Sequence, residues 1–129
     1  MILRQWQKFF EEGILHRIPN KIGSNIYALY TDYASDRNGE YSFVIGAMVK
    51  KGTIAPDGMV LKTIAGGRFA VLNSDQGLLP KIVPGVWREI WKLEDEKELR
   101  RTYNIDFEIY DQRSQDPQNA QVDLYVGIK

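Results

Sequence analysis

The stretch NIYALYTDYASDRNGEYSFVIGAMVKKG, residues 25–52, decides the fold. Two runs rich in tyrosine and β-branched residues flank Asn38-Gly39, a dipeptide typical of tight hairpin turns because both residues tolerate positive φ. The stretch therefore predicts an antiparallel hairpin, with strands over 25–35 and 41–52. No helix lies between the two runs, as a parallel pair would require.

The residues before the hairpin predict a helix. Apolar side chains recur at intervals of three and four residues over 2–12, which is the pattern of an amphipathic helix. Gly13 offers a C-terminal stop for this helix. Residues 14–24 contain Pro19 and other breakers, and we expect a loop there.

The residues after the hairpin predict further strands and a second helix. Residues 59–74 indicate two strands separated by Gly66-Gly67, and residues 78–101 indicate a helix with Pro84 near its first turn. Two more strands follow over 103–111 and 121–129. The order α-β-β-β-β-α-β-β predicts a single α+β domain over 1–129, with two helices packed on an antiparallel sheet.

Composition excludes several classes of site. Lys plus Arg equals Asp plus Glu at 17 each, whereas a nucleic-acid-binding domain usually carries a basic stripe. The chain has no cysteine and one histidine, His16, which excludes disulfides, thiolate zinc sites and clusters of histidine ligands. No apolar run approaches the roughly 20 residues of a membrane helix, and no signal peptide pattern is present. We expect a cytoplasmic protein that binds neither membrane nor nucleic acid directly.

Motifs of catalysis are missing from the sequence. The Gly66-Gly67 pair lacks the spacing of phosphate-binding loops, and His16 has no evident partner for a Ser-His-Asp arrangement. The acidic run at 94–98 is more typical of a solvated helix end than of a metal site. We therefore expect no enzyme activity, no cofactor and no metal.

One carboxylate stands out in DFEIYDQR, residues 106–113. Strand alternation places Phe107 and Ile109 on one face and Glu108 on the other, together with Tyr110. Trp87 and the other predicted site tryptophan, Trp91, lie one helical turn apart. Aromatic walls around one carboxylate suit a lipophilic cation. The pattern equally allows a solvated Glu108 beside core tryptophans, and both interpretations stay open at this point.

Several stretches together resemble the effector-binding domain of AraC-type and multidrug-responsive transcription regulators, which also occurs as stand-alone gyrase-inhibitor-like proteins in bacteria. They cover most of residues 25–129 in the family's order, although Gly127 stands where a proline is common. The matching stretches are IYALYTDYASDRNGEYSFVIGAMV (26–49), IAGGRFAVL (64–72), VWREIWKL (86–93), DFEIYD (106–111), DP (116–117) and VDLYVGIK (122–129).

This resemblance implies a duplicated β-α-β-β module. The two copies would form one curved antiparallel sheet, with two helices on one face and a pocket between helices and sheet. The family's first strand has no counterpart in the given sequence, because Ile2 already begins the predicted helix. Either the sequence is truncated there or the natural protein lacks that strand. A missing strand exposes a sheet edge, at which two copies of the chain could pair as a homodimer.

The resemblance also implies a binding site. Multidrug-binding members contact cationic aromatic ligands through an acidic residue on the sheet floor, and DFEIY places that residue at Glu108. Trp87 and Trp91 would line one wall, Tyr110 would share the strand face, and Tyr27 or Tyr33 would approach from the hairpin.

We accordingly expect a sensor or sequestering module for small lipophilic, cationic or amphipathic ligands, of the transcription-regulator type but without DNA binding of its own. Two alternatives remain. One is a protein-interaction module of the gyrase-inhibitor type that uses the exposed edge. The other is a small-molecule hydrolase in which Glu108 and Tyr110 perform acid–base chemistry.

Overall fold

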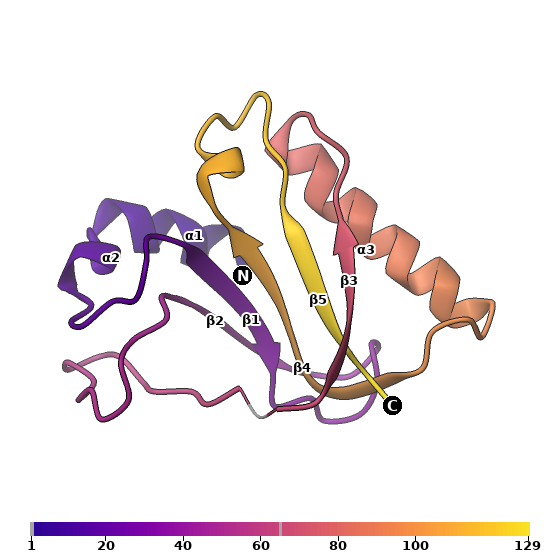
Figure 1. Ribbon diagram of the computed structural model, residues 1–129, viewed down its shortest axis with the longest axis horizontal. Helices are drawn as coiled ribbons and strands as arrows, with labels where there is room; N and C mark the ends of the chain where they lie inside the picture. The colour runs from indigo at the N-terminus through magenta and orange to yellow at the C-terminus, as the bar shows by residue number, and fades with distance from the viewer. Residues whose placement is uncertain (1, 65) are drawn as a thin grey trace.

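The computed structural model describes residues 2–64 and 66–129 and confirms the α+β class (Figure 1). Five strands form one antiparallel sheet in the order β2-β1-β4-β5-β3. Figure 1 shows α1 and α2 beside the strands of the first half, and α3 beside β3 and β5. The elements are α1 (Ile2–Glu11), α2 (Ile14–Arg17), β1 (Ile26–Thr31), β2 (Ser42–Gly46), β3 (Arg68–Asn73), α3 (Leu79–Asp95), β4 (Arg101–Tyr110), the 3-10 turn η1 (Gln112–Ser114) and β5 (Asp123–Ile128).

The predicted hairpin is present. Strands β1 and β2 pair in antiparallel register, with Leu29 opposite Val44 and Tyr30 opposite Phe43. In the connecting turn, the Asp36 carboxylate accepts a hydrogen bond from the backbone N–H of Asn38 at 2.9 Å. Both strands are shorter than expected, because the ladder between them joins only residues 27–31 and 42–46.

Two predictions about the connections are wrong. Residues 59–64 do not form a strand, and the other described residues between β2 and β3 do not form one either. Gly52 and Gly58 take positive φ there, and a turn closes between Pro56 and Met59. Alternating apolar and polar side chains do not form a strand unless a neighbouring strand supplies hydrogen-bond partners for the backbone N–H and C=O groups. The predicted loop over 14–24, in turn, contains the short helix α2.

The second helix differs from its predicted bounds at both ends. Pro80 occupies its first turn, so Pro84 lies inside the helix rather than near its beginning. The helix ends after Asp95, and Lys97 takes a left-handed φ of 61°, which reverses the chain toward β4. The last predicted helical residue, Arg101, is therefore the first residue of a strand.

Both longer helices cover the same face of the sheet. Helix α3 buries Val86 and Ile90 against Leu124 and Val126 of β5. Helix α1 brings the Trp6 ring to 5.0 Å from the ring of Tyr110 on β4. Tyr110 also packs against the part of the core that contains residues of α3, so the predicted arrangement of two helices on one face is confirmed. In the described residues, no helix combines the length and the apolar character of a membrane span.

A buried ion pair fixes the beginning of β4. Tyr103 takes a φ of 56°, and the register between β4 and β5 shifts between Arg101 and Asp106. The Arg101 Nη2 atom lies 2.8 Å from Asp106 Oδ2, and both side chains are buried. Tyr33 donates its hydroxyl to the same carboxylate at 2.5 Å.

Gly127 completes this cluster. Its backbone N–H donates to Asp106 Oδ1 at 2.9 Å, which a proline could not do because it has no N–H. A Cβ at this position would lie 2.8 Å from Thr102 Oγ1, so larger residues are excluded as well. The departure from the proline common in the resembling family thus serves the buried carboxylate.

Substitution of Asp106 should be severe. Asp106→Asn leaves the buried Arg101 with only the more distant Glu94 carboxylate, at 3.6 Å, as a counter-charge. Loss of one partner costs about 3–5 kcal/mol in comparable buried pairs. Asp32→Asn breaks the exposed pair with Lys62 and should shift the urea midpoint far less. Urea denaturation of both variants checks this, and equal losses of stability would show that the buried pair is not a main anchor of β4.

Candidate functional site

Glu108 lies at the centre of the sheet, on the face that the helices cover. It sits opposite Ala28 of β1 and Leu124 of β5, and it is 1% exposed. Phe107 points to the other face, where its ring stacks on Tyr125 at 4.8 Å. The predicted facing is therefore confirmed, and the alternative of a solvated Glu108 is wrong.

Three neutral donors hold the Glu108 carboxylate. Tyr30 of β1 and Trp87 of α3 donate to Oε2 at 2.9 Å and 2.7 Å, and Tyr110 of β4 donates to Oε1 at 2.6 Å. Burial raises the pKa of Glu108 above its ordinary value, and these hydrogen bonds offset only part of that rise. Burial and the adjacent carboxylate also raise the pKa of both tyrosines, which therefore remain donors.

The two buried carboxylates of β4 differ in their partners. Asp106 and Glu108 lie two residues apart, so both face the helices. Asp106 pairs with Arg101, whereas no basic side chain in the described residues forms an ion pair with Glu108. The site consequently combines a central buried carboxyl group with no cation of the protein's own.

Aromatic side chains from five elements surround this carboxyl group. The Trp87 ring lies 5.0 Å from Tyr30 and 6.5 Å from Trp91, which is 41% exposed. The rings of Trp6 and Phe43 lie 5.0 Å from Tyr110 and Tyr30, respectively. Flat, electron-rich faces at this spacing favour aromatic and cationic groups over polar neutral ones.

Three of the six predicted site residues come together in the structure, namely Glu108, Trp87 and Tyr110. Trp91 lies one turn further along α3, against Trp87. Tyr33 bonds Asp106 instead of Glu108, and Tyr27 lies on the other face, with its ring 6.4 Å from Phe107. The predicted approach of Tyr27 or Tyr33 to Glu108 is thus wrong.

Sequence reasoning missed Tyr30 and Trp6. Tyr30 has the same strand parity as Ala28, the partner of Glu108 on β1, so alternation would have found it once the β1–β4 register was known. That register depends on tertiary packing and is not encoded in either strand's periodicity. Trp6 belonged to the predicted apolar face of α1, but nothing in the sequence aligned that face with Tyr110.

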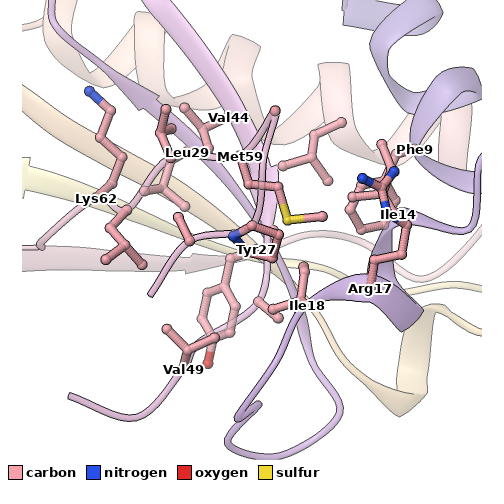
Figure 2. Close-up of a pocket in the computed structure, with 18 of the residues that line it drawn as sticks. Phe9, Ile14, Arg17, Ile18, Tyr27, Leu29, Val44, Val49, Met59 and Lys62 are labelled. Atoms are coloured by element: carbon pink, nitrogen blue, oxygen red, sulfur yellow. The ribbon is translucent and has the colours of Figure 1, made fainter. Parts of the chain in front are cut away.

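A separate cavity of about 860 Å³ opens at the edge of the sheet beside β2. Figure 2 shows Phe9 and Ile14 on one side of it and Leu29, Val44 and Met59 on the other. Tyr27 lines this cavity, but Glu108 lies across the sheet on the helix-covered face. The cavity beside β2 and the buried carboxyl group of Glu108 are therefore two separate features of the fold.

Comparisons with known proteins agree with an effector-binding role. The family model for integron-associated effector binding proteins matches residues 1–128. YobU of Bacillus subtilis, whose name describes a candidate transcriptional regulator, is 39% identical over 105 residues, or 81% of this chain and 64% of that protein. Transcriptional regulator BrlR of Pseudomonas aeruginosa is 33% identical over 125 residues, or 95% of this chain and 44% of the regulator. The chain thus spans less than two thirds of either relative.

The raised pKa of Glu108 makes stability depend on pH. Above pH 4.5, the ordinary pKa of a glutamate, the unfolded chain releases the Glu108 proton while the folded chain retains it. The free energy of unfolding should therefore fall by up to about 1.4 kcal/mol per pH unit until the folded pKa is passed. Glu108→Gln removes this dependence, whereas Glu89→Gln, at an exposed position of α3, should retain it. Urea denaturation across this pH range compares the three proteins, and a parallel profile for Glu108→Gln would contradict the assignment.

Proposed function

The chain belongs to the family of integron-associated effector binding proteins, and on that premise we propose that it binds small lipophilic cations against Glu108. The contrast between the two buried carboxylates carries this proposal. Asp106 has Arg101 as its counter-charge, while Glu108 has only the neutral donors Tyr30, Trp87 and Tyr110. A bound cation supplies the charge that Glu108 lacks.

Charge pairing sets the preference for a cation. In a site of low dielectric, a ligand cation favours the ionised form of Glu108 and offsets the cost of its burial. A neutral ligand of the same shape gains the aromatic contacts but not this pairing. Positive ligands therefore bind more tightly than their neutral counterparts.

Aromatic walls set the shape preference. The indole N–H of Trp87 donates a hydrogen bond to Glu108 Oε2. A ligand that reaches Oε2 displaces this donor and stacks on the faces of the surrounding aromatic rings. Trp91 is the more exposed of the two tryptophans, and in this proposal a ligand approaches Glu108 past its ring. Stacking tolerates many flat shapes, and the site accepts a range of aromatic cations.

Binding of this kind fits a sensor or sequestering module. The relatives YobU and BrlR carry names of regulators, and their sequences extend well beyond the part that matches this chain. In this proposal the chain corresponds to the effector-binding part of such a regulator. A DNA-binding segment, where one is used, lies outside residues 1–129 or on another chain.

Titration with a rhodamine-type dye, followed by tryptophan fluorescence, tests the proposal. Glu108→Gln should weaken binding of the cationic dye by on the order of tenfold or more, because it removes one partner of a buried charge pair. Affinity of the native protein should rise with pH as Glu108 ionises, and that rise should vanish in Glu108→Gln. A neutral dye of similar shape should bind both proteins alike.

Glu89→Gln serves as the matched control, since it removes the same charge from the exposed side of α3. It should leave dye affinity unchanged. Equal affinities of native protein and Glu108→Gln for the cationic dye would refute the role of Glu108. Conversion of the dye to a product by the native protein, lost in Glu108→Gln, would instead favour a hydrolase.

A further inference from the structure

Arg101 is a buried cation beside the Glu108 site. Its side chain is 2% exposed and lies between the sheet and α3, where it pairs with Asp106 of β4 and comes within 3.6 Å of Glu94 on α3. The Arg101 Cζ atom is 5.6 Å from the centre of the Trp87 ring, and the N–H of the same ring donates to Glu108. The Trp87 indole therefore lies next to both charged groups.

Two nitrogen atoms of the Arg101 guanidinium have no hydrogen-bond partner in the part of the chain that the structure describes. Nη2 donates to Asp106 Oδ2 at 2.8 Å, whereas Nε and Nη1 are buried without an acceptor. The Glu94 carboxylate lies 3.6 Å from Nη1, which is an ion-pair contact beyond hydrogen-bond range. Buried N–H groups are nearly always paired, and one left without an acceptor is unfavourable. Nε and Nη1 are therefore donors that a bound molecule could use.

Neighbouring side chains hold the guanidinium in one orientation. The Tyr103 ring lies 4.3 Å from Arg101 Cζ, and the Tyr103 hydroxyl donates to Glu94 of α3. Tyr103 takes a φ of 56°, a left-handed conformation that is unfavourable for a bulky aromatic residue. Such a conformation persists only where surrounding contacts impose it, and it is common beside binding sites. The two unpaired donors of Arg101 are therefore preorganised.

The positive charge of Arg101 is already balanced by the protein. Asp106 pairs with it at 2.8 Å, and Glu94 is shared between Arg101 and Arg37, at 3.6 Å and 3.5 Å. A carboxylate on a ligand would add a further buried negative charge without a counter-charge, which is unfavourable. A neutral acceptor, such as a carbonyl oxygen, satisfies the free N–H groups and brings no charge.

We propose that Arg101 determines which cations bind, and that the site prefers aromatic cations with a neutral hydrogen-bond acceptor at the end opposite the charge. The positive group lies against Glu108, and Arg101 donates from Nε or Nη1 to the acceptor. A charge spread over the whole ligand would instead be repelled by Arg101 at the far end. The pairing of Arg101 with Asp106 is retained, because it uses Nη2. This inference rests on the proposed cation site and adds the class of cation that it selects.

Two probes of equal shape test the preference for an acceptor. In para-acetylphenyl-trimethylammonium a carbonyl group stands opposite the cation, and in para-isopropenylphenyl-trimethylammonium a carbon–carbon double bond replaces it. The native protein should bind the acetyl probe about tenfold more tightly, because only its oxygen accepts a hydrogen bond from a charged donor. The para-carboxylate analogue should bind more weakly than the acetyl probe. Isothermal titration calorimetry measures the three affinities.

Arg101→Lys is the matched variant. It keeps a positive charge for Asp106 but has one nitrogen in place of the three of a guanidinium. Both probes should still bind, and the preference for the acetyl probe should disappear. Arg88→Lys, at an exposed position of α3, should retain the preference.

NMR of the native protein gives an independent readout if Arg101→Lys does not fold. The 1H and 15N signals of the Arg101 Nε–H or Nη1–H groups should shift when the acetyl probe is added and stay in place with the isopropenyl probe. An arginine with a purely structural role would respond to both probes alike or to neither, and that result would overturn the inference.

The outcomes separate the role of Arg101 from that of Glu108. Glu108→Gln should weaken both probes to the same extent. Equal affinities of the two probes for the native protein, both weakened in Glu108→Gln, would refute the role of Arg101 and leave the cation site intact. Unchanged affinities in Glu108→Gln would refute the cation site itself. A preference for the acetyl probe that persists in Arg101→Lys would assign the acceptor to another donor and would also overturn the inference.

Discussion

Burial of the Glu108 carboxyl group is the constraint on which the arrangement of the sheet and helices depends. Its three donors come from β1, α3 and β4, so one side chain ties both halves of the chain together at the centre of the sheet. A buried carboxylate is tolerated only when its oxygens are satisfied. Neutral donors satisfy the carboxylate oxygens but do not cancel a negative charge, so the ionisation of Glu108 stays sensitive to pH and to a nearby cation.

The neighbouring Arg101–Asp106 pair shows what a neutralised carboxylate does in the same sheet. It holds the distorted beginning of β4 in place, and its Asp106 carboxylate accepts hydrogen bonds from the Tyr33 hydroxyl and the Gly127 backbone N–H. The Arg101 guanidinium also lies 5.6 Å from the Trp87 ring. The aromatic wall of the candidate site therefore rests on the structural ion pair. Two carboxylates on one strand face thus differ in their partners, because Asp106 is neutralised by an arginine and Glu108 is held by neutral donors.

Periodicity predicted what alternation and helical spacing can encode. It placed Glu108 and Tyr110 on one face and Phe107 on the other, and it found the hairpin and both long helices. It could not set the register between β1 and β4, and so it selected Tyr27 and Tyr33 in place of Tyr30. It also assigned a strand to residues 59–64, whose alternating side chains line a groove at the edge instead of joining a ladder.

A 13C NMR titration of the Glu108 carboxyl carbon, with and without a quaternary ammonium ligand, tests the proposed pairing of a cation with Glu108 most directly. The pKa of Glu108 should lie above the ordinary glutamate value in the free protein, and a bound cation should lower it. An ordinary pKa that the cation leaves unchanged would contradict this pairing.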